Sequence, residues 1–164
     1  PRVQLLGSGT ILREVIAAAA ILKDDYNVNA DIWSVTSFNE LRREALDVVR
    51  WNMLHPTEPA KASHVENCLQ GREGPVVAAT DYMKIYADQI REFIPGHYRV
   101  LGTDGFGRSD TREKLRHFFE VDRFYITVAA LKALSEEGKI PSEQVVQAMQ
   151  KYGIDPEKPN PVTV

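Results

Sequence analysis

The amino-acid sequence predicts an α/β domain with a mostly parallel sheet. Short apolar runs alternate along the chain with segments of helical periodicity, the arrangement that produces parallel strands joined by crossover helices. Two glycine-rich turns, Gly7-Ser8-Gly9 and Gly102 to Gly107, each separate an apolar run from a helical segment. We therefore expect both turns to lie along one edge of the sheet.

Four segments are expected to form strands because they are short, apolar or alternating, and bounded by turn residues. They are residues 3–6, 30–36, 75–79 and 98–101. Judged from these residues alone, the sheet has four strands and helices on both faces, which makes three layers.

Helices are expected where apolar residues recur every three or four positions. Ser37 and Glu40 match a capping box. Thr80-Asp81 and Asp110 are expected to cap the helices that follow them. The expected helices cover residues 11–23, 37–54, 62–69, 82–93, 110–119, 124–137 and 142–152.

The length of 164 residues corresponds to one domain. We expect residues 1–154 to form this single α/β domain. Residues 155–164 contain three prolines and are expected to form a loosely ordered tail. A chain that starts at Pro1 and enters a strand almost at once is typical of a domain taken from a longer polypeptide.

The composition is that of an ordinary globular protein, with 43% hydrophobic and 26% charged residues. A net charge of -3 argues against nucleic-acid binding, which requires a basic surface. No apolar run approaches the ~20 residues of a membrane span. The single Cys68 excludes an internal disulfide and a thiolate metal cage, and favours a reducing, cytoplasmic location.

The turn Gly7-Ser8-Gly9 has part of a dinucleotide-binding fingerprint. The complete fingerprint requires a glycine at position 12, where this chain has Leu12. We interpret the segment as a tight strand-to-helix turn. The alternative is an anion bound at the amino terminus of the following helix.

The segment Thr103-Asp104-Gly105 matches a fragment of the Gly-Asp-Gly magnesium motif of thiamine diphosphate enzymes. That motif requires an Asn 25 to 30 residues later, and no Asn occurs between Gly105 and Lys158. A hard cation would therefore lack oxygen ligands here. We expect Asp104 to bond the backbone of its own turn instead.

No other set of residues forms a catalytic constellation. The four histidines lie on different elements, and no two of them have the i, i+4 spacing of a helical metal site. Dense charges between Arg108 and Arg116 indicate a solvated helix face or salt bridges across an interface. The candidate interface or anion-binding residues are Gly7, Ser8, Gly9, Asp104, Gly105, Arg108 and Asp110.

Four blocks of the sequence resemble one known family: LLGSGTILREV, SVTSFNELRREALDVVRWNMLHP, ATDYMKIYADQIREF and YRVLGTDGFGRSDTREKLRHFFEVD. They occur in the same order in the carboxy-terminal domain of the large homodimeric bacterial-type pyruvate dehydrogenases. The similarity runs from Val3 to Pro161. The blocks WNMLHP and LGTDGFGRSD are specific to this family, whereas the glycine turns are shared with transketolases.

The resemblance implies a five-stranded sheet with one antiparallel strand, so a further strand is expected near Arg123 to Val128. It implies a parent oxidoreductase that decarboxylates pyruvate with thiamine diphosphate and Mg²⁺ and reductively acetylates a lipoyl group. In this family, domains outside this chain hold the cofactor. No catalytic, cofactor-binding or metal-binding residue is therefore expected here, and the isolated chain should be inactive.

The partners that the resemblance implies are the remaining domains, a second subunit of a homodimer and the dihydrolipoyl acetyltransferase. A role in dimer and interdomain packing is the first hypothesis for this domain. Alternatives are an anion- or effector-binding regulatory module that uses Arg13, Arg108 and Arg112, and a docking site for the acetyltransferase. Another transketolase-like thiamine diphosphate enzyme is the remaining enzyme alternative.

Overall fold

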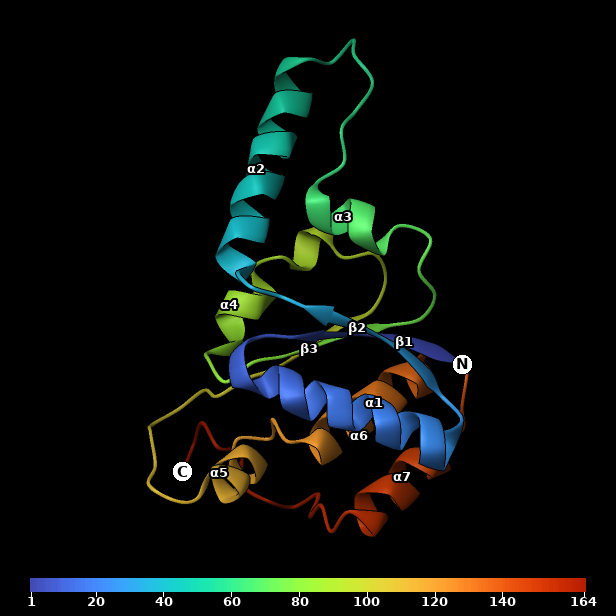
Figure 1. Cartoon of the computed structure of the whole chain (residues 1–164), viewed down its shortest axis with the longest axis vertical. Coiled ribbons are helices and arrows are strands. Elements are labelled where there is room, and N and C mark those ends of the chain that lie inside the picture. Colours follow the sequence, from blue (N-terminus) through green and yellow to red (C-terminus); the bar gives the residue numbers. More distant parts are fainter.

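The computed structural model describes all 164 residues and contains a four-stranded sheet and seven α-helices (Figure 1). The strands are β1 (Arg2–Gly7), β2 (Asn29–Ser34), β3 (Val76–Ala79) and β4 (Tyr98–Leu101). The helices are α1 (Leu12–Tyr26), α2 (Phe38–Leu54), α3 (His64–Leu69), α4 (Lys84–Asp88), α5 (Arg112–Phe118), α6 (Arg123–Glu136) and α7 (Ser142–Lys151). Single 3-10 turns span Gly9–Ile11 and Arg91–Phe93.

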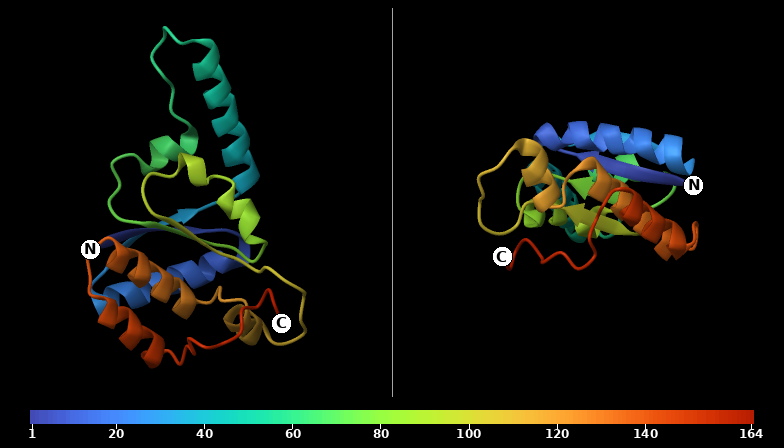
Figure 2. Two further views of the ribbon diagram at one scale, coloured as in Figure 1. Left: turned by 180° about the vertical axis from the view of Figure 1, so that it is seen from behind. Right: turned by 90° about the horizontal axis from the view of Figure 1, so that it is seen from below.

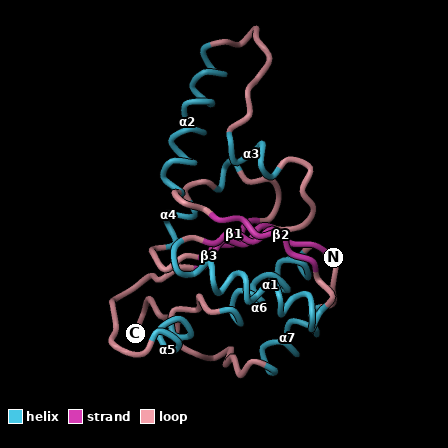
Figure 3. Tube along the Cα trace, in the orientation of Figure 1, coloured by secondary structure: helices cyan, strands magenta, loops and turns pink.

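The sheet is parallel throughout, with strand order β2-β1-β3-β4, and lies between two layers of helices (Figure 3). α1 and α6 cover one face, while α2, α3 and α4 lie on the other. This distribution follows from right-handed crossovers that run in opposite directions across the sheet, from β1 to β2 through α1 and from β2 past β1 to β3 through α2 and α3. The switch in direction falls between β1 and β3, so the carboxyl ends of these two strands define the edge where sites form in such sheets.

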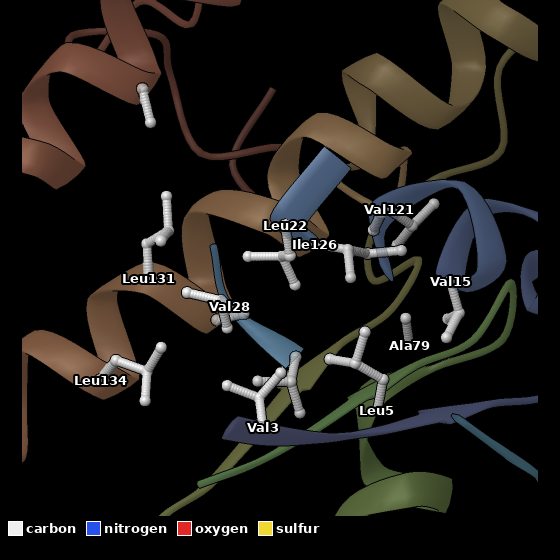
Figure 4. Close-up of a cluster of buried hydrophobic side chains, with 14 of the residues drawn as sticks. Val3, Leu5, Val15, Leu22, Val28, Ala79, Val121, Ile126, Leu131 and Leu134 are labelled. Carbon is white, nitrogen blue, oxygen red and sulfur yellow. The ribbon is translucent and has the colours of Figure 1, made fainter. Parts of the chain in front are cut away.

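Alternate residues of β1 supply the two cores. Val3 and Leu5 point into the cluster formed with α1, α6 and α7, shown in Figure 4. Leu6 points the opposite way, into the cluster formed with α2, α3 and α4. A central strand with both faces buried is hydrophobic at nearly every position, which explains why the sequence showed it as a continuous apolar run.

Gln4 is the buried polar residue of β1, and every polar atom of its side chain is hydrogen-bonded. Its Nε2 donates to Asp31 Oδ2 at 2.9 Å and to the carbonyl oxygen of Glu73 at 3.0 Å. Its Oε1 accepts from Trp33 Nε1 at 2.9 Å. Burial of an amide is tolerable because these bonds replace water, and they join β1 to both neighbours of its amino-terminal end.

The expectation of a fifth, antiparallel strand is wrong, since residues 123–128 form the first turns of α6. The reason is the cap: Asp122 Oδ1 accepts from the amides of Phe124 and Tyr125 at 3.0 and 2.9 Å. This cap satisfies two otherwise unpaired donors and commits the segment to a helix. The four strands identified from the residues themselves are confirmed.

Two expected caps are also corrected. Glu40 of the expected capping box pairs with Arg43, so only the Ser37 half of the box is present. The complete capping box belongs to Ser63 and Glu66, at the start of α3. Thr111, not Asp110, caps α5 by accepting from the amide of Lys114.

The expected helix over residues 82–93 is divided into α4 and a 3-10 turn, and Thr80-Asp81 does not cap it. Asp81 Oδ2 instead accepts from Thr10 Oγ1 at 3.0 Å. That carboxylate is bonded across the sheet edge and does not cap the helix. The helix begins at Lys84, and the amide of Lys84 donates to Asp104 Oδ1 at 3.0 Å.

α2 projects from the body of the molecule as an arm (Figures 1 and 2). Its tip is formed by the WNMLHP block. The Trp51 ring stacks on His55 with centroids 4.3 Å apart, and Lys61 Nζ lies 3.6 Å from the centroid of the same ring. The side-chain amide of Asn52 bonds both the N–H and the carbonyl of Lys61. His55 is therefore half-buried in this stack.

The last ten residues form no helix or strand and lie against the segment around α5. Lys158 Nζ donates to the carbonyl of Phe118 at 2.7 Å and pairs with Glu120 at 3.0 Å. Pro161 is buried beside Gly105. The tail therefore makes specific contacts at Lys158 and Pro161.

We predict that Gly74→Ala is strongly destabilising, whereas Gly71→Ala is a mild change. Both residues have positive φ, +84° and +71°. A Cβ on Gly74 would lie 1.8 Å from the carbonyl oxygen of Arg2, at the start of β1, whereas one on Gly71 meets nothing within 4 Å.

At Gly71 the positive φ alone should make the Ala variant about 1–2 kcal/mol less stable, measured as the free energy of unfolding. The backbone clash should raise the cost at Gly74 to at least about 3 kcal/mol. Urea unfolding of the 164-residue chain measures both. Equal losses of stability in the two variants would contradict the close approach.

Candidate functional site

Hydroxyl and carboxylate side chains join the turns at the carboxyl edge of the sheet. Ser8 Oγ donates to Thr80 Oγ1 at 2.9 Å, linking the ends of β1 and β3. Thr103 Oγ1, after β4, donates to the carbonyl of Asp81 at 2.9 Å. The structure thus brings the turn at Gly7-Ser8-Gly9 and the turn after β4 to one edge, through the segment between them.

Two glycines of this edge are required by close packing. A Cβ on Gly7 would lie 2.9 Å from Leu12 Cα, and one on Gly102 would lie 2.7 Å from the carbonyl oxygen of Tyr82. These contacts let the following segments pack directly on the strand ends. They account for both glycines without a bound ligand.

Asp104 has a different partner from the one expected. Its Oδ1 accepts from the amide of Lys84, at the start of α4, rather than from its own turn. The N-cap residue of α4 is Met83, whose side chain makes no cap hydrogen bond, so the carboxylate of a neighbouring loop supplies the acceptor. Asp104 therefore positions α4.

The loop from Gly105 to Asp110 extends away from these turns. Arg108 lies over the ring of Phe118, with its guanidinium carbon 4.5 Å from the centroid, and Asp110 is 3.9 Å from Lys114 Nζ. Both candidate residues therefore contact α5 and are not joined to Gly7, Ser8 or Gly9. Phe106 at the tip is 86% exposed.

Phe106 was not singled out from the sequence, although a signal was available. A large aromatic residue between two turn glycines cannot be there for turn geometry, which favours small or polar residues. Exposed aromatic rings are typical of contact sites between proteins.

The most buried charge of the molecule is Glu14, in the first turn of α1. The residue is 4% exposed. Its Oε1 accepts from Arg116 Nη1 at 2.9 Å, and its Oε2 accepts from Arg123 Nε at 2.9 Å and from the Arg123 amide at 3.1 Å. Burial acts to raise the pKa of Glu14, but the hydrogen bonds and charges of the two arginines outweigh it and hold this pKa below its usual range.

This cluster ties α1 to the junction of α5 and α6, about a hundred residues away in sequence. It also bears on the anion expected at the amino terminus of α1. Glu14 places a carboxylate of the chain itself in that first turn. The favourable helix-end position is thus already used by an internal anion.

The residues do not fit a magnesium ion or the diphosphate bound through it. No group of three or more His, Cys, Asp or Glu side chains in the chain could hold a metal. The two carboxylates nearest the expected motif, Asp81 and Asp104, accept from Thr10 and from the Lys84 amide. Each carboxylate therefore has one oxygen in a structural hydrogen bond.

A small cavity of about 280 Å³ lies between the end of β2, α2 and α3. Its lining includes His64 and Cys68, with Sγ 3.5 Å from Nε2. The i, i+4 spacing of this pair is visible in the sequence, where no two histidines share it. The remaining lining is largely apolar.

Comparisons with known proteins agree with this fold. The model of the transketolase-like TK C-terminal domain matches residues 1–122. The chain belongs to this family. A solved transketolase described as a split gene, inactive beta4 tetramer shares the fold, with a TM-score of 0.56 and 18% identity over 82% of this chain and 39% of that one.

Several full-length relatives carry one name. The chain is 62% identical over its whole length to the pyruvate dehydrogenase E1 component of Cupriavidus necator. It is 63% identical over 161 residues to that of Pseudomonas aeruginosa and 53% to that of Escherichia coli. It spans 18% of the length of these relatives. The resemblance to the C-terminal domain of the pyruvate dehydrogenase E1 component is thereby confirmed.

No helix of this transketolase-like domain combines the length and the apolarity that a membrane crossing requires.

We predict that Glu14→Gln lowers the free energy of unfolding of the 164-residue chain by about 2–4 kcal/mol at pH 7, because it leaves two arginines beside a neutral group. The pKa of Glu14 is lowered in the folded state, so its contribution is complete above the ordinary glutamate pKa of about 4.3. The contribution disappears as the pH falls below that value towards the native pKa. Urea unfolding from pH 7 to pH 3 measures the difference between the two proteins.

Glu40→Gln is the matched control, because Glu40 forms an exposed pair with Arg43. It should change stability by no more than about 0.5 kcal/mol. A penalty for Glu14→Gln that stayed constant down to pH 3 would show that its charge is not the source of the stabilisation.

Proposed function

We propose that this chain is the carboxy-terminal, non-catalytic domain of a pyruvate dehydrogenase. The parent component decarboxylates pyruvate with thiamine diphosphate and Mg²⁺ and reductively acetylates the lipoyl group of a dihydrolipoyl acetyltransferase. The observation that carries the proposal is the match of the whole chain to E1 components of which it makes up 18%. The lack of a metal-binding group among its side chains supports a cofactor site in other domains.

Within the parent, this domain supports packing between domains and between the two subunits of a homodimer in the cytoplasm. Residues 1–154 form the packing unit, and residues 155–164 are an appended tail. The loop with Phe106 supports this role. A Cβ on Gly105 would lie 2.8 Å from the carbonyl of Pro161, so the tail packs directly against the loop while the ring points into solvent. A ring presented in this way loses little freedom on binding.

We expect Phe106→Ala to weaken the dimer of the full-length enzyme about 30-fold, the effect of losing roughly 2 kcal/mol at an aromatic contact. Arg108→Ala and Asp110→Ala should weaken it less, since both side chains already contact α5. Sedimentation velocity over a dilution series measures the dissociation constant.

The control is Ile16→Ala, which removes an exposed apolar side chain from α1 on another part of the surface. It should leave the dimer unchanged. Neither Phe106→Ala nor Ile16→Ala should change the free energy of unfolding of the isolated chain by more than about 0.5 kcal/mol. An unchanged dimer in Phe106→Ala would remove the loop from the interface.

Calorimetric titration with thiamine diphosphate and Mg²⁺ tests the placement of the cofactor site. We expect no heat of binding with the 164-residue chain and stoichiometric binding with the full-length enzyme. The donors that a magnesium ion requires are not assembled in this chain. Stoichiometric binding by the isolated chain would contradict the proposal.

A further inference from the structure

The outer part of α2 carries an apolar stripe that nothing in this chain covers. Phe38 and Ala45 bury the inner side of its first half. Leu46, Val49 and Met53 are spaced i, i+3, i+7 and share another side of the helix, with 41%, 45% and 69% of their surface exposed. Exposure of three large apolar residues in register on one helix is typical of a contact surface.

The α4 segment adjoins the base of this side of α2. Asn39, one heptad before Leu46 and therefore on the same side of α2, accepts from Gln89 Nε2. Gln89 follows Ile85 by four residues, so both lie on one side of the α4 segment. Ile85 and Tyr82 are exposed. We call the surface made of Tyr82, Ile85, Leu46, Val49 and Met53 the arm face.

The ribbon views (Figures 1 and 2) show that one side of the outer half of α2 has no neighbouring element. α3 and the chain that returns from the tip lie along one side of α2, α4 lies at its base, and no element accompanies the other side of its outer half (Figures 1 and 2). The tip is held by the stack of Trp51 on His55 and by the bonds between Asn52 and Lys61. A partner therefore meets a preformed surface.

Basic side chains edge the arm face. Arg42 and Arg50 are spaced four residues before and after Leu46, on its side of the helix. Arg43 pairs with Glu40, whereas Arg42 and Arg50 form no salt bridge in the chain. The fitting partner has an apolar strip with carboxylates beside it.

We propose that the arm face docks on a part of the parent polypeptide outside this chain that presents an apolar strip edged by carboxylates. The inference rests on the proposed function, because it takes the chain as one domain of a longer component; the chain spans 18% of the length of the relatives that it matches. A second copy of this chain fits less well. A two-fold axis between antiparallel arms brings Arg42 of one copy beside Arg50 of the other, and like charges repel.

Oxidation of Met53 by dilute hydrogen peroxide, followed by peptide mass spectrometry, tests the proposal. We compare the 164-residue chain with the full-length enzyme. In the isolated chain Met53 is exposed and should oxidise rapidly. In the full-length enzyme its rate should fall at least 10-fold, and the double variant Leu46→Glu with Val49→Glu should restore the rate of the isolated chain.

The matched control is Asp47→Lys, an equally exposed charge change on the far side of α2. It should leave Met53 protected. Circular dichroism of the isolated double variant establishes that α2 still folds. Equal oxidation of Met53 in both proteins overturns the proposal.

Protection of Met53 that appears in the isolated chain as its concentration rises also overturns the proposal, and assigns the face to a second copy. The readout does not depend on catalysis. A full-length protein that protects Met53 but does not decarboxylate pyruvate would refute the proposed function and leave the docking surface in place.

Discussion

The position of β1 at the centre of the sheet is the constraint on which the rest of the structure depends. β1 pairs with β2 on one side and β3 on the other, and its alternate side chains fill both cores. The backbone around it is equally crowded, since Gly74 touches the start of the strand and Gly7 lets α1 fold back onto its end. Each neighbouring element is therefore located by a contact with these six residues.

Much of this architecture is readable in the sequence. The four strands stand out because a buried parallel strand is a short continuous apolar run. The long helices stand out through their periodicity. The residues that cap α4 and α5 could not be assigned from the sequence in the same way. Several polar residues precede each helix, and a polar residue there can also bond to another part of the chain. Asp81 binds Thr10, some seventy residues away, and so is lost to the helix beside it.

The contacts that join distant parts of the chain were least predictable. In the sequence Glu14 is one of several acidic residues near a helix start, and only the fold shows that Arg116 and Arg123 enclose it. Gln4 was concealed within an apolar strand in the same way. The family resemblance predicted a fifth strand that the Asp122 cap prevents. The resemblance correctly predicted the family of the chain, but it did not predict the hydrogen bonds of the Asp122 cap.

The length of α2 has a mechanical consequence. Seventeen helical residues extend about 25 Å, and the helix is anchored at its base by Phe38. A rotation of 10° about that anchor carries the far end through about 4 Å. The stacked Trp51 and His55, with the bonds between Asn52 and Lys61, hold the far end of the helix in shape. The position of Met53 is therefore far more sensitive to the angle at which α2 leaves the sheet than the position of Asn39 is.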